Sequence, residues 1–124
     1  MYIPKEQGKV KTYFQISWAL QTPVVLLQDQ QYYPCLFSQV LSWQADLSNA
    51  PYVIDVHDCD NFAFRYKGVA DEFTNAVGIV LGKYLNTWHV WNMAITNKGI
   101  RQVEPQQGLY FEHDNRYRPM IVLI

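Results

Sequence analysis

Hydrophobic and polar positions change their period along the chain, and these changes separate expected strands from expected helices. Between Val10 and Leu20, bulky apolar residues alternate with polar or smaller ones, which predicts a half-buried strand. Thr22-Pro23 interrupts that run. From Pro34 to Leu47 the apolar residues fall at helical spacing, and proline suits the first turn of a helix. This second segment is therefore expected to be helical.

The rest of the chain predicts one more helix and then several strands. Asp58 is a suitable N-cap for a helix, and apolar residues follow it at i, i+4, i+7, i+8 and i+11 (Phe62, Tyr66, Val69, Ala70 and Phe73). Expected strands are Ala76–Leu81, Trp88–Thr96, Ile100–Glu104 and the terminal "PMIVLI". The "NKG" loop before Ile100 predicts a hairpin with Gly99 at positive φ. Early helices and a late antiparallel sheet indicate the α+β class.

Composition limits the kind of protein that this chain can be. It has 124 residues, 49% of them hydrophobic and 15% aromatic, without a visible linker or repeat, so we expect one folded domain over residues 1–124. Ten basic residues nearly balance eleven acidic ones, which gives no electrostatic support for nucleic-acid binding. The apolar runs are too short to span a membrane, and the N-terminus does not resemble a secretory signal. The expected location is therefore the cytoplasm.

Metal and disulfide chemistry have little support. The two cysteines, Cys35 and Cys59, form neither a disulfide framework nor a C-x-x-C pair. His57, His89 and His113 are scattered and lack the paired spacing of zinc ligands. We therefore expect no metal site and no cofactor, and we expect Cys35 to be a buried apolar residue.

Cys59 is the residue with the most specific chemical context. In the first turn of a helix capped by Asp58, free backbone N–H groups and the helix dipole favour a thiolate. The neighbouring carboxylates of Asp58 and Asp60 have the opposite effect. The cysteine would therefore need a histidine to become reactive, and His89, at the start of an expected strand, is the preferred candidate over His57 and His113.

Glu104 is the candidate that would orient this histidine. A carboxylate that accepts the second ring N–H of His89 would fix its tautomer and stabilise the imidazolium. A three-residue "NKG" loop would place Thr96 opposite Ile100 and turn Glu104 away from the His89 side. Because a slip of one residue reverses the side-chain faces, this triad predicts a bulge or a shifted turn between residues 96 and 105.

The stretches "DCDNFAF", "WHVWNMA" and "GIRQVEPQ", in this order, resemble a papain-like cysteine peptidase domain. The resemblance extends to the C-terminal domain of certain fungal agglutinins, to related short phage and bacterial proteins, and to NlpC/P60 peptidases. It covers residues 52–108. It implies a papain-like (NlpC/P60-like) core, with the cysteine-bearing helix packed on an antiparallel sheet. It also implies Cys59 as nucleophile, His89 as general base and Glu104 as its orienting partner.

The chain departs from the papain-like pattern at the oxyanion hole. Val53 stands where these enzymes often have a glutamine. The backbone N–H of Cys59 would supply one donor, and Gln15 and Gln21 are candidates for the second. The resemblance does not assign this second donor.

Three functions follow from these residues. The first is a thiol hydrolase that acts on a peptide or protein substrate: His89 takes the proton of Cys59, and the thiolate attacks a carbonyl to form a thioester. The second is a catalytically inactive papain-like binding module, such as a small phage protein that inhibits a host factor in the bacterial cytoplasm. The third is a structural component of a virion or complex. The oligomeric state stays open.

Several aromatic residues have two interpretations. Trp88, Trp91, Tyr32, Tyr33 and Tyr110 could line a peptide or sugar site, because aromatic rings offer flat amphipathic surfaces. We expect most of them in the core instead. Repeated aromatic-and-Gln motifs, which would indicate a lectin trefoil, are missing from the sequence.

Overall fold

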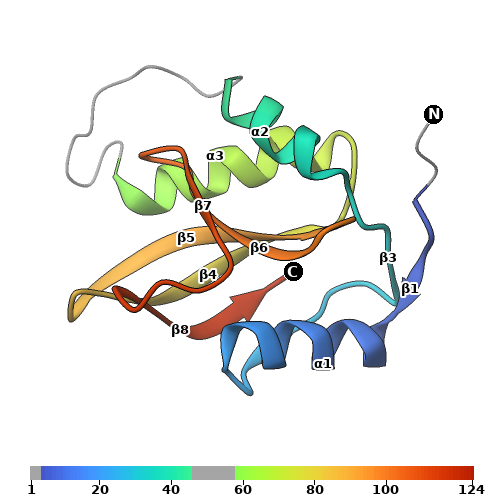
Figure 1. Ribbon diagram of the computed structural model, residues 1–124, viewed down its shortest axis with the longest axis horizontal. Coiled ribbons are helices and arrows are strands. Elements are labelled where there is room, and N and C mark those ends of the chain that lie inside the picture. The colour runs from blue at the N-terminus through green and yellow to red at the C-terminus, as the bar shows by residue number, and fades with distance from the viewer. Residues whose placement is uncertain (1–3, 46–57) are drawn as a thin grey trace.

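The computed structural model describes residues 4–45 and 58–124 and arranges them in three layers (Figure 1). A six-stranded sheet lies in the middle, with α2 and α3 on one face and α1 on the other. The helices are α1 (Lys9–Leu20), α2 (Phe37–Ala45) and α3 (Cys59–Asp71). The strands are β1 (Gln7–Gly8), β2 (Val25–Leu26), β3 (Gln31–Tyr32), β4 (Val77–Tyr84), β5 (Thr87–Thr96), β6 (Gly99–Glu104), β7 (Leu109–Phe111) and β8 (Tyr117–Leu123).

The main sheet has the strand order β2-β8-β4-β5-β6-β7. The short edge strand β2 runs parallel to β8, and the other neighbouring strands are antiparallel. Strands β1 and β3 form a separate two-stranded sheet. Within the described residues, no helix is both long and apolar enough to cross a membrane.

The segment expected as the first strand is the helix α1, and this expectation was wrong. Its buried residues recur every fourth position (Thr12, Ile16 and Leu20), while a second set at the same spacing is exposed (Val10, Phe14 and Trp18). Positions four apart satisfy a period of two as well as the repeat of a helix. The alternation was therefore ambiguous, and packing against the sheet selects the helix. Gln21 ends it in a left-handed conformation, with φ at 54°.

Two apolar cores fill the spaces on either side of the sheet. The core beneath α1 is the larger, and its central members include Ile16, Leu20, Val80, Trp91, Met93, Ile95 and Val122. The core beneath α2 and α3 includes Cys35, Val40, Trp43, Tyr66, Ala70, Val77, Ala94 and Val103. Adjacent residues of β5 thus face different cores, as the alternation of a strand buried on both faces requires.

Helix α3 confirms the expected capping and is fixed to the sheet. Asp58 is its N-cap, and the Asp58 backbone N–H donates to Oδ1 of Asn61 at 3.1 Å. Asn92, fully buried in β5, donates from Nδ2 to the carbonyl of Ala63 in α3 and to that of Gly78 in β4, at 2.9 and 3.0 Å. This amide therefore sets the position of the helix over the strands.

Helix α2 begins later than expected and is anchored at its start. It starts at Phe37, whose backbone N–H donates at 2.9 Å to Oδ1 of Asn97 in the β5–β6 turn. Cys35 is buried just before it, as expected, and pairs with the end of β5 at Thr96. The expected end of the helix at Leu47 lies outside the described residues.

The expected α+β, papain-like core is corrected by this architecture, which is mostly β with three short helices. The sheet has six strands, and it includes a parallel edge strand and the short β7, neither of which was expected. The N-terminal segment adds a helical layer on the face of the sheet opposite α3. The physical reason is that a strand of two or three residues leaves no recognisable periodic signal, because it is too short for the two-residue alternation to recur.

Candidate functional site

His89 and Glu104 meet on one face of the sheet because the turn between β5 and β6 has two residues and not the expected three. Thr96 pairs with Gly99, not with Ile100, so only Asn97 and Lys98 form the turn. Gly99 has φ of 96°, which confirms the expected positive value. This shift of one residue pairs Asn92 with Val103 and places Glu104 on the opposite face, shared with His89. The shifted turn that the triad required is thus present.

The His89–Glu104 pair is direct and buried. Nε2 of the imidazole forms a hydrogen bond with Oε1 of Glu104, a residue that is only 3% exposed. The hydroxyl of Tyr117 donates to the same carboxylate oxygen at 3.1 Å. Burial raises the pKa of Tyr117, and the Glu104 carboxylate raises it further. The phenol therefore stays protonated and acts as a donor.

Aromatic rings hold the imidazole in place. His89 stacks on Trp91 with ring centroids 5.8 Å apart and an interplanar angle of 21°. Tyr84 and Tyr117 lie 5.8 and 6.2 Å from the imidazole centroid. The second carboxylate oxygen of Glu104 is buried and has no hydrogen-bond partner among the described residues. The ring orientation is thus fixed by its neighbours and by one hydrogen bond.

Cys59 lies beside the backbone of β5, next to His89 in the sequence of that strand. It is the first residue of α3, and its thiol lies against the backbone N–H of Val90, the residue that follows His89. Burial raises the pKa of the Cys59 thiol, and the carboxylates of Asp58 and Asp60 raise it further, while the N–H of Val90 lowers it. The balance favours a thiol over a thiolate.

Two other residues considered for the catalytic site, His57 and Val53, lie outside the described residues. Gln15 sits on α1, across the sheet from α3, and accepts a hydrogen bond from Gln7 at 2.8 Å. The sequence interpretation missed Tyr117, because the polar stretch around it predicts a loop and only the pairing of β8 with β4 brings it to Glu104.

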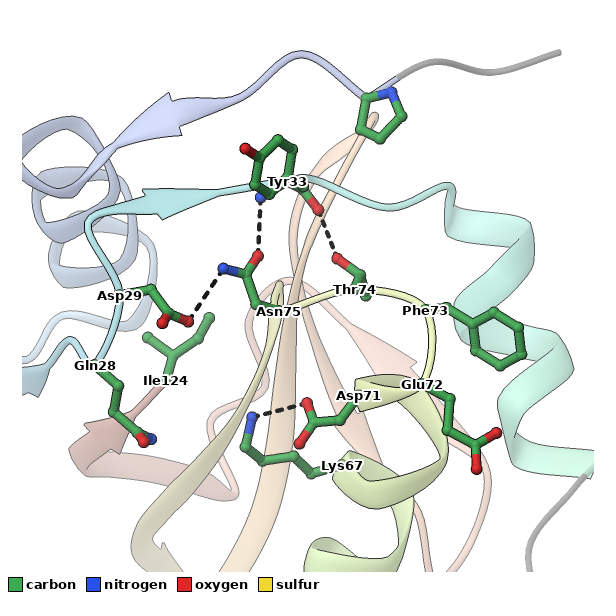
Figure 2. Close-up of a pocket in the computed structure, with 11 residues that line it drawn as sticks. Gln28, Asp29, Tyr33, Lys67, Asp71, Glu72, Phe73, Thr74, Asn75 and Ile124 are labelled. Atoms are coloured by element: carbon green, nitrogen blue, oxygen red, sulfur yellow. Dashed lines mark hydrogen bonds and ion pairs between the residues drawn. The ribbon is translucent and has the colours of Figure 1, made fainter.

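A separate pocket lies at the C-terminal end of α3 (Figure 2). Its volume is about 670 Å³. It is lined by segments far apart in the chain, namely Pro4, Gln28, Asp29, Tyr33, Lys67, Asp71, Glu72, Phe73, Thr74, Asn75 and Ile124. We call it the α3–β4 pocket. Sequence reasoning had singled out Tyr33 as an aromatic that could line a sugar site, but it had not identified the pocket, because no single segment contains it.

Asn75 organises one wall of the α3–β4 pocket (Figure 2). Its Oδ1 accepts from the backbone N–H of Tyr33 at 3.0 Å. Its Nδ2 donates to Oδ2 of Asp29 at 3.1 Å and to the carbonyl of Gln31 at 2.8 Å. Thr74 adds a hydrogen bond of 2.6 Å from its hydroxyl to the carbonyl of Tyr33. This network joins the end of α3 to β3 and gives the wall a fixed shape.

The other wall carries charge. Nζ of Lys67 donates to Oδ1 of Asp71 at 3.1 Å and to the carbonyl of Val77 at 2.7 Å. The lining therefore contains three carboxylate side chains (Asp29, Asp71 and Glu72) and one ammonium group (Lys67). In residues 4–45 and 58–124, no group of three or more His, Cys, Asp or Glu side chains is arranged to hold a metal ion.

Comparison with known proteins gives a fold but no family. No family model matches the chain, and no curated protein matches it either. Similar solved structures include the PSL1a–E64 complex, with a TM-score of 0.80, and Polyporus squamosus lectin bound to the human-type influenza-binding epitope Neu5Acα2-6Galβ1-4GlcNAc, with a TM-score of 0.78. Each is 24% identical and covers 96% of this chain. The chain spans 50% and 49% of the two matched chains, about half of their length.

These neighbours correct the family and the function expected from the motifs. The resemblance to a papain-like cysteine peptidase is overturned, because the matched solved structures are lectin chains and no family model supports a peptidase. The thiol hydrolase, its peptide or protein substrate and the phage-type inhibitor are overturned with it. The physical reason is that three short motifs specify a helix start and two strand ends, and these do not determine the whole fold. The chain shares its fold with half of a lectin chain.

Proposed function

We propose that this chain is a carbohydrate-binding domain that uses the α3–β4 pocket. The observation that carries the proposal is a pocket of about 670 Å³ lined by aromatic, amide and carboxylate side chains, in a fold shared with lectin chains. Ligand pockets combine apolar surface with a few fixed polar groups that set orientation. A sugar presents both an apolar C–H face and a ring of hydroxyl groups, and therefore needs both kinds of surface.

The aromatic residues of the pocket are exposed yet held in place. Phe73 is 64% exposed and stacks on Trp43, with ring centroids 6.3 Å apart and an interplanar angle of 22°. Tyr33 is 42% exposed, and its hydroxyl donates to Oε2 of Glu6 at 3.1 Å. Exposed rings with little freedom offer binding surface at a low entropic cost.

The polar groups can accept hydrogen bonds from hydroxyl groups. Asn75 uses its amide internally and fixes the position of Asp29. A carboxylate has about four acceptor positions, so Asp29 keeps capacity for a ligand after its bond to Asn75. Glu72, which is exposed at the end of α3, supplies a second acceptor.

The charge of the pocket favours a neutral sugar. Three carboxylates oppose a single ammonium group in the lining, so the carboxylate of a sialic acid would meet repulsion. We therefore expect this pocket to bind neutral glycans, in contrast to the sialylated epitope bound by the Polyporus squamosus lectin.

Isothermal titration calorimetry of the chain with Galβ1-4GlcNAc and with its sialylated form tests the proposal. We expect the neutral sugar to bind, and Phe73→Ala to weaken binding by about tenfold or more. Phe64→Ala is the matched control, because Phe64 is 58% exposed on α3 and does not line the pocket. Binding that survives Phe73→Ala and Asp29→Ala, or a panel of neutral glycans without any binding, contradicts it.

The catalytic assignment of Cys59, His89 and Glu104 stays a separate proposal, without an assigned reaction. The buried His89–Glu104 pair supports it, and so does the position of the Cys59 thiol beside Val90. If the imidazole acts on the sulfur, His89→Ala should slow iodoacetamide alkylation of Cys59 at neutral pH. An unchanged rate would remove His89 from the role of base.

A further inference from the structure

The β4–β5 hairpin, which forms one end of the main sheet (Figure 1), exposes two large apolar side chains at its tip. Tyr84 pairs with Thr87, so the turn consists of Leu85 and Asn86. Leu85 is 62% exposed, and Trp88, the second residue of β5, is 56% exposed. Neighbouring exposed apolar side chains rimmed by polar residues are typical of interaction sites.

The conformation of this turn makes Leu85 an unfavourable residue at its position. Leu85 and Asn86 have φ of 48° and 69°. Two-residue turns with both φ values positive favour asparagine, aspartate or glycine, and a bulky side chain is uncommon there. The backbone N–H of Leu85 donates to the carbonyl of Arg116 at 3.0 Å, so the segment before β8 holds the turn in place. The fold thus keeps a large apolar residue in a strained and exposed position, which indicates a role other than folding stability.

Basic side chains flank the tip. Lys83 is directly opposite Trp88 in β5 and directly opposite Arg118 in β8, so the three side chains share one face of the sheet. Nζ of Lys83 lies 4.1 Å from the centroid of the Trp88 ring. In the part of the chain that the structure describes, neither Lys83 nor Arg118 has a carboxylate within ion-pair distance. Both charges are therefore available to an anionic partner.

The acidic groups near the tip do not cancel these charges. Asp114 is bound by Arg116 at 2.6 Å. Asp58 and Asp60 lie at the start of α3, where the chain contacts Val90, further along β5 from the turn. The charge left uncompensated beside the turn is therefore positive.

We propose that the tip of the β4–β5 hairpin docks on an anionic lipid membrane, with Leu85 and Trp88 at the acyl boundary and the two free basic groups at the phosphates. Charge complementarity selects this partner. A neutral apolar partner would leave Lys83 and Arg118 without counter-charges, and a soluble anion would leave Leu85 in water. An anionic bilayer satisfies both, because its interface accepts tryptophan and leucine and its surface potential attracts lysine and arginine.

This surface is separate from the proposed sugar site. Thr74 and Asn75 line the α3–β4 pocket just before β4 begins, whereas Leu85 follows the last residue of β4. The eight residues of this strand place the pocket and the tip about 25 Å apart. Membrane docking at the tip therefore leaves the pocket uncovered, and Leu85→Asn should not change the affinity for a neutral sugar. Either proposal can thus fail without the other.

Co-sedimentation with lipid vesicles tests the docking. We expect the chain to bind vesicles of phosphatidylcholine with about 30% phosphatidylserine and not vesicles of phosphatidylcholine alone. Binding should be lost at about 1 M salt, where screening reduces the range of electrostatic attraction to about 3 Å. Equal binding to both kinds of vesicle, or no binding to either, overturns the proposal.

Substitutions at the tip test the apolar contact. Leu85→Asn should weaken vesicle binding by about tenfold or more, and it cannot act by unfolding the hairpin, because asparagine suits this turn better than leucine. Trp88→Ala should have a similar effect. Trp18→Ala is the matched control, because Trp18 is 87% exposed on α1, across the sheet from α3. Vesicle binding that resists both tip variants, or that Trp18→Ala abolishes, overturns the proposal.

A single charge and a spectroscopic signal test the orientation. Lys83→Gln should weaken binding by about fivefold, whereas Lys98→Gln, at the turn that follows the other end of β5, should change it less than about twofold. Lipids brominated on their acyl chains should quench the fluorescence of the unmodified chain but not that of Trp88→Phe, since Trp43 and Trp91 are buried. Equal effects of the two lysine variants, or quenching that persists in Trp88→Phe, overturn the proposal.

Discussion

Nε2 of His89 and Oε1 of Glu104 are joined by a hydrogen bond between neighbouring strands, and one turn determines whether they can meet. With Thr96 paired to Gly99, both side chains lie on the same face of the sheet. One more residue in the turn would place Glu104 on the face of α3. Formation of the His89–Glu104 pair therefore depends on the register of the hairpin as well as on the two residue types.

Replacing Glu104 by glutamine should destabilise the fold. The substitution keeps the shape but removes the buried negative charge that accepts from His89 and Tyr117. We expect the free energy of unfolding at pH 7 to fall by about 1.5–3 kcal/mol, measured by urea denaturation. Glu112→Gln is the control, because Glu112 is 73% exposed in its ion pair with Arg101, and it should change stability by less than about 0.5 kcal/mol. Equal effects of the two variants would contradict the structural role of the pair.

The reactivity of Cys59 should depend on Asp60. Burial and the carboxylates of Asp58 and Asp60 raise the pKa of the thiol, so the thiolate fraction at pH 7 is smaller than that of a free cysteine. Asp60→Asn removes one of these carboxylates, lowers the pKa and should speed alkylation by iodoacetamide at neutral pH.

The control for this experiment is Cys59→Ser. Burial raises the pKa of Cys35 to about 12, so the folded Cys59→Ser variant should not react. A midpoint of alkylation below that of a free thiol, in the unmodified chain, would contradict the expected direction.

Two glycines should respond to alanine in opposite directions. A Cβ on Gly82 would lie 2.1 Å from the carbonyl oxygen of Arg118 and 2.8 Å from Cη2 of Trp91. Because β8 pairs with β4 here, Gly82→Ala must separate the strands and should cost about 3 kcal/mol or more. Gly68, on α3, has no atom within 4 Å of an added Cβ.

Gly68→Ala should therefore stabilise the protein by about 0.5–1 kcal/mol through helix propensity. Thermal denaturation of both variants measures the two shifts. A destabilising Gly68→Ala would show that the space beside α3 is filled.

Asn92 should be required for the docking of α3. Asn92→Ala removes both hydrogen bonds from a fully buried amide and leaves the carbonyls of Ala63 and Gly78 without this donor. We expect a loss of about 2–4 kcal/mol and faster hydrogen exchange in α3 than in β8. Asn115→Ala, at an exposed position, should have little effect. Uniform acceleration across the chain would indicate global unfolding without a specific role in docking.

The sequence predicted the elements in which one pattern dominates over several repeats. Helix α3 follows from Asp58 and the apolar spacing after it, and β4, β5 and β6 follow from β-branched runs and the turn before Gly99. The alternation from Val10 to Leu20 satisfied two periods at once, so local reasoning selected the wrong one. Short strands such as β2 and β7 have no pattern of their own and exist because a neighbouring strand provides partners.

By itself, the sequence determined the chemistry of the chain and the local structures that depend on neighbouring residues: the capped helix, the long strands, and the candidates His89 and Glu104. Only the tertiary structure decided which side chains meet. It set the hairpin register that pairs His89 with Glu104, brought Tyr117 to the same carboxylate, and assembled the α3–β4 pocket from distant segments. The physical reason is that helix and strand periodicity arises within a few residues, whereas a site arises from long-range packing that no local pattern encodes.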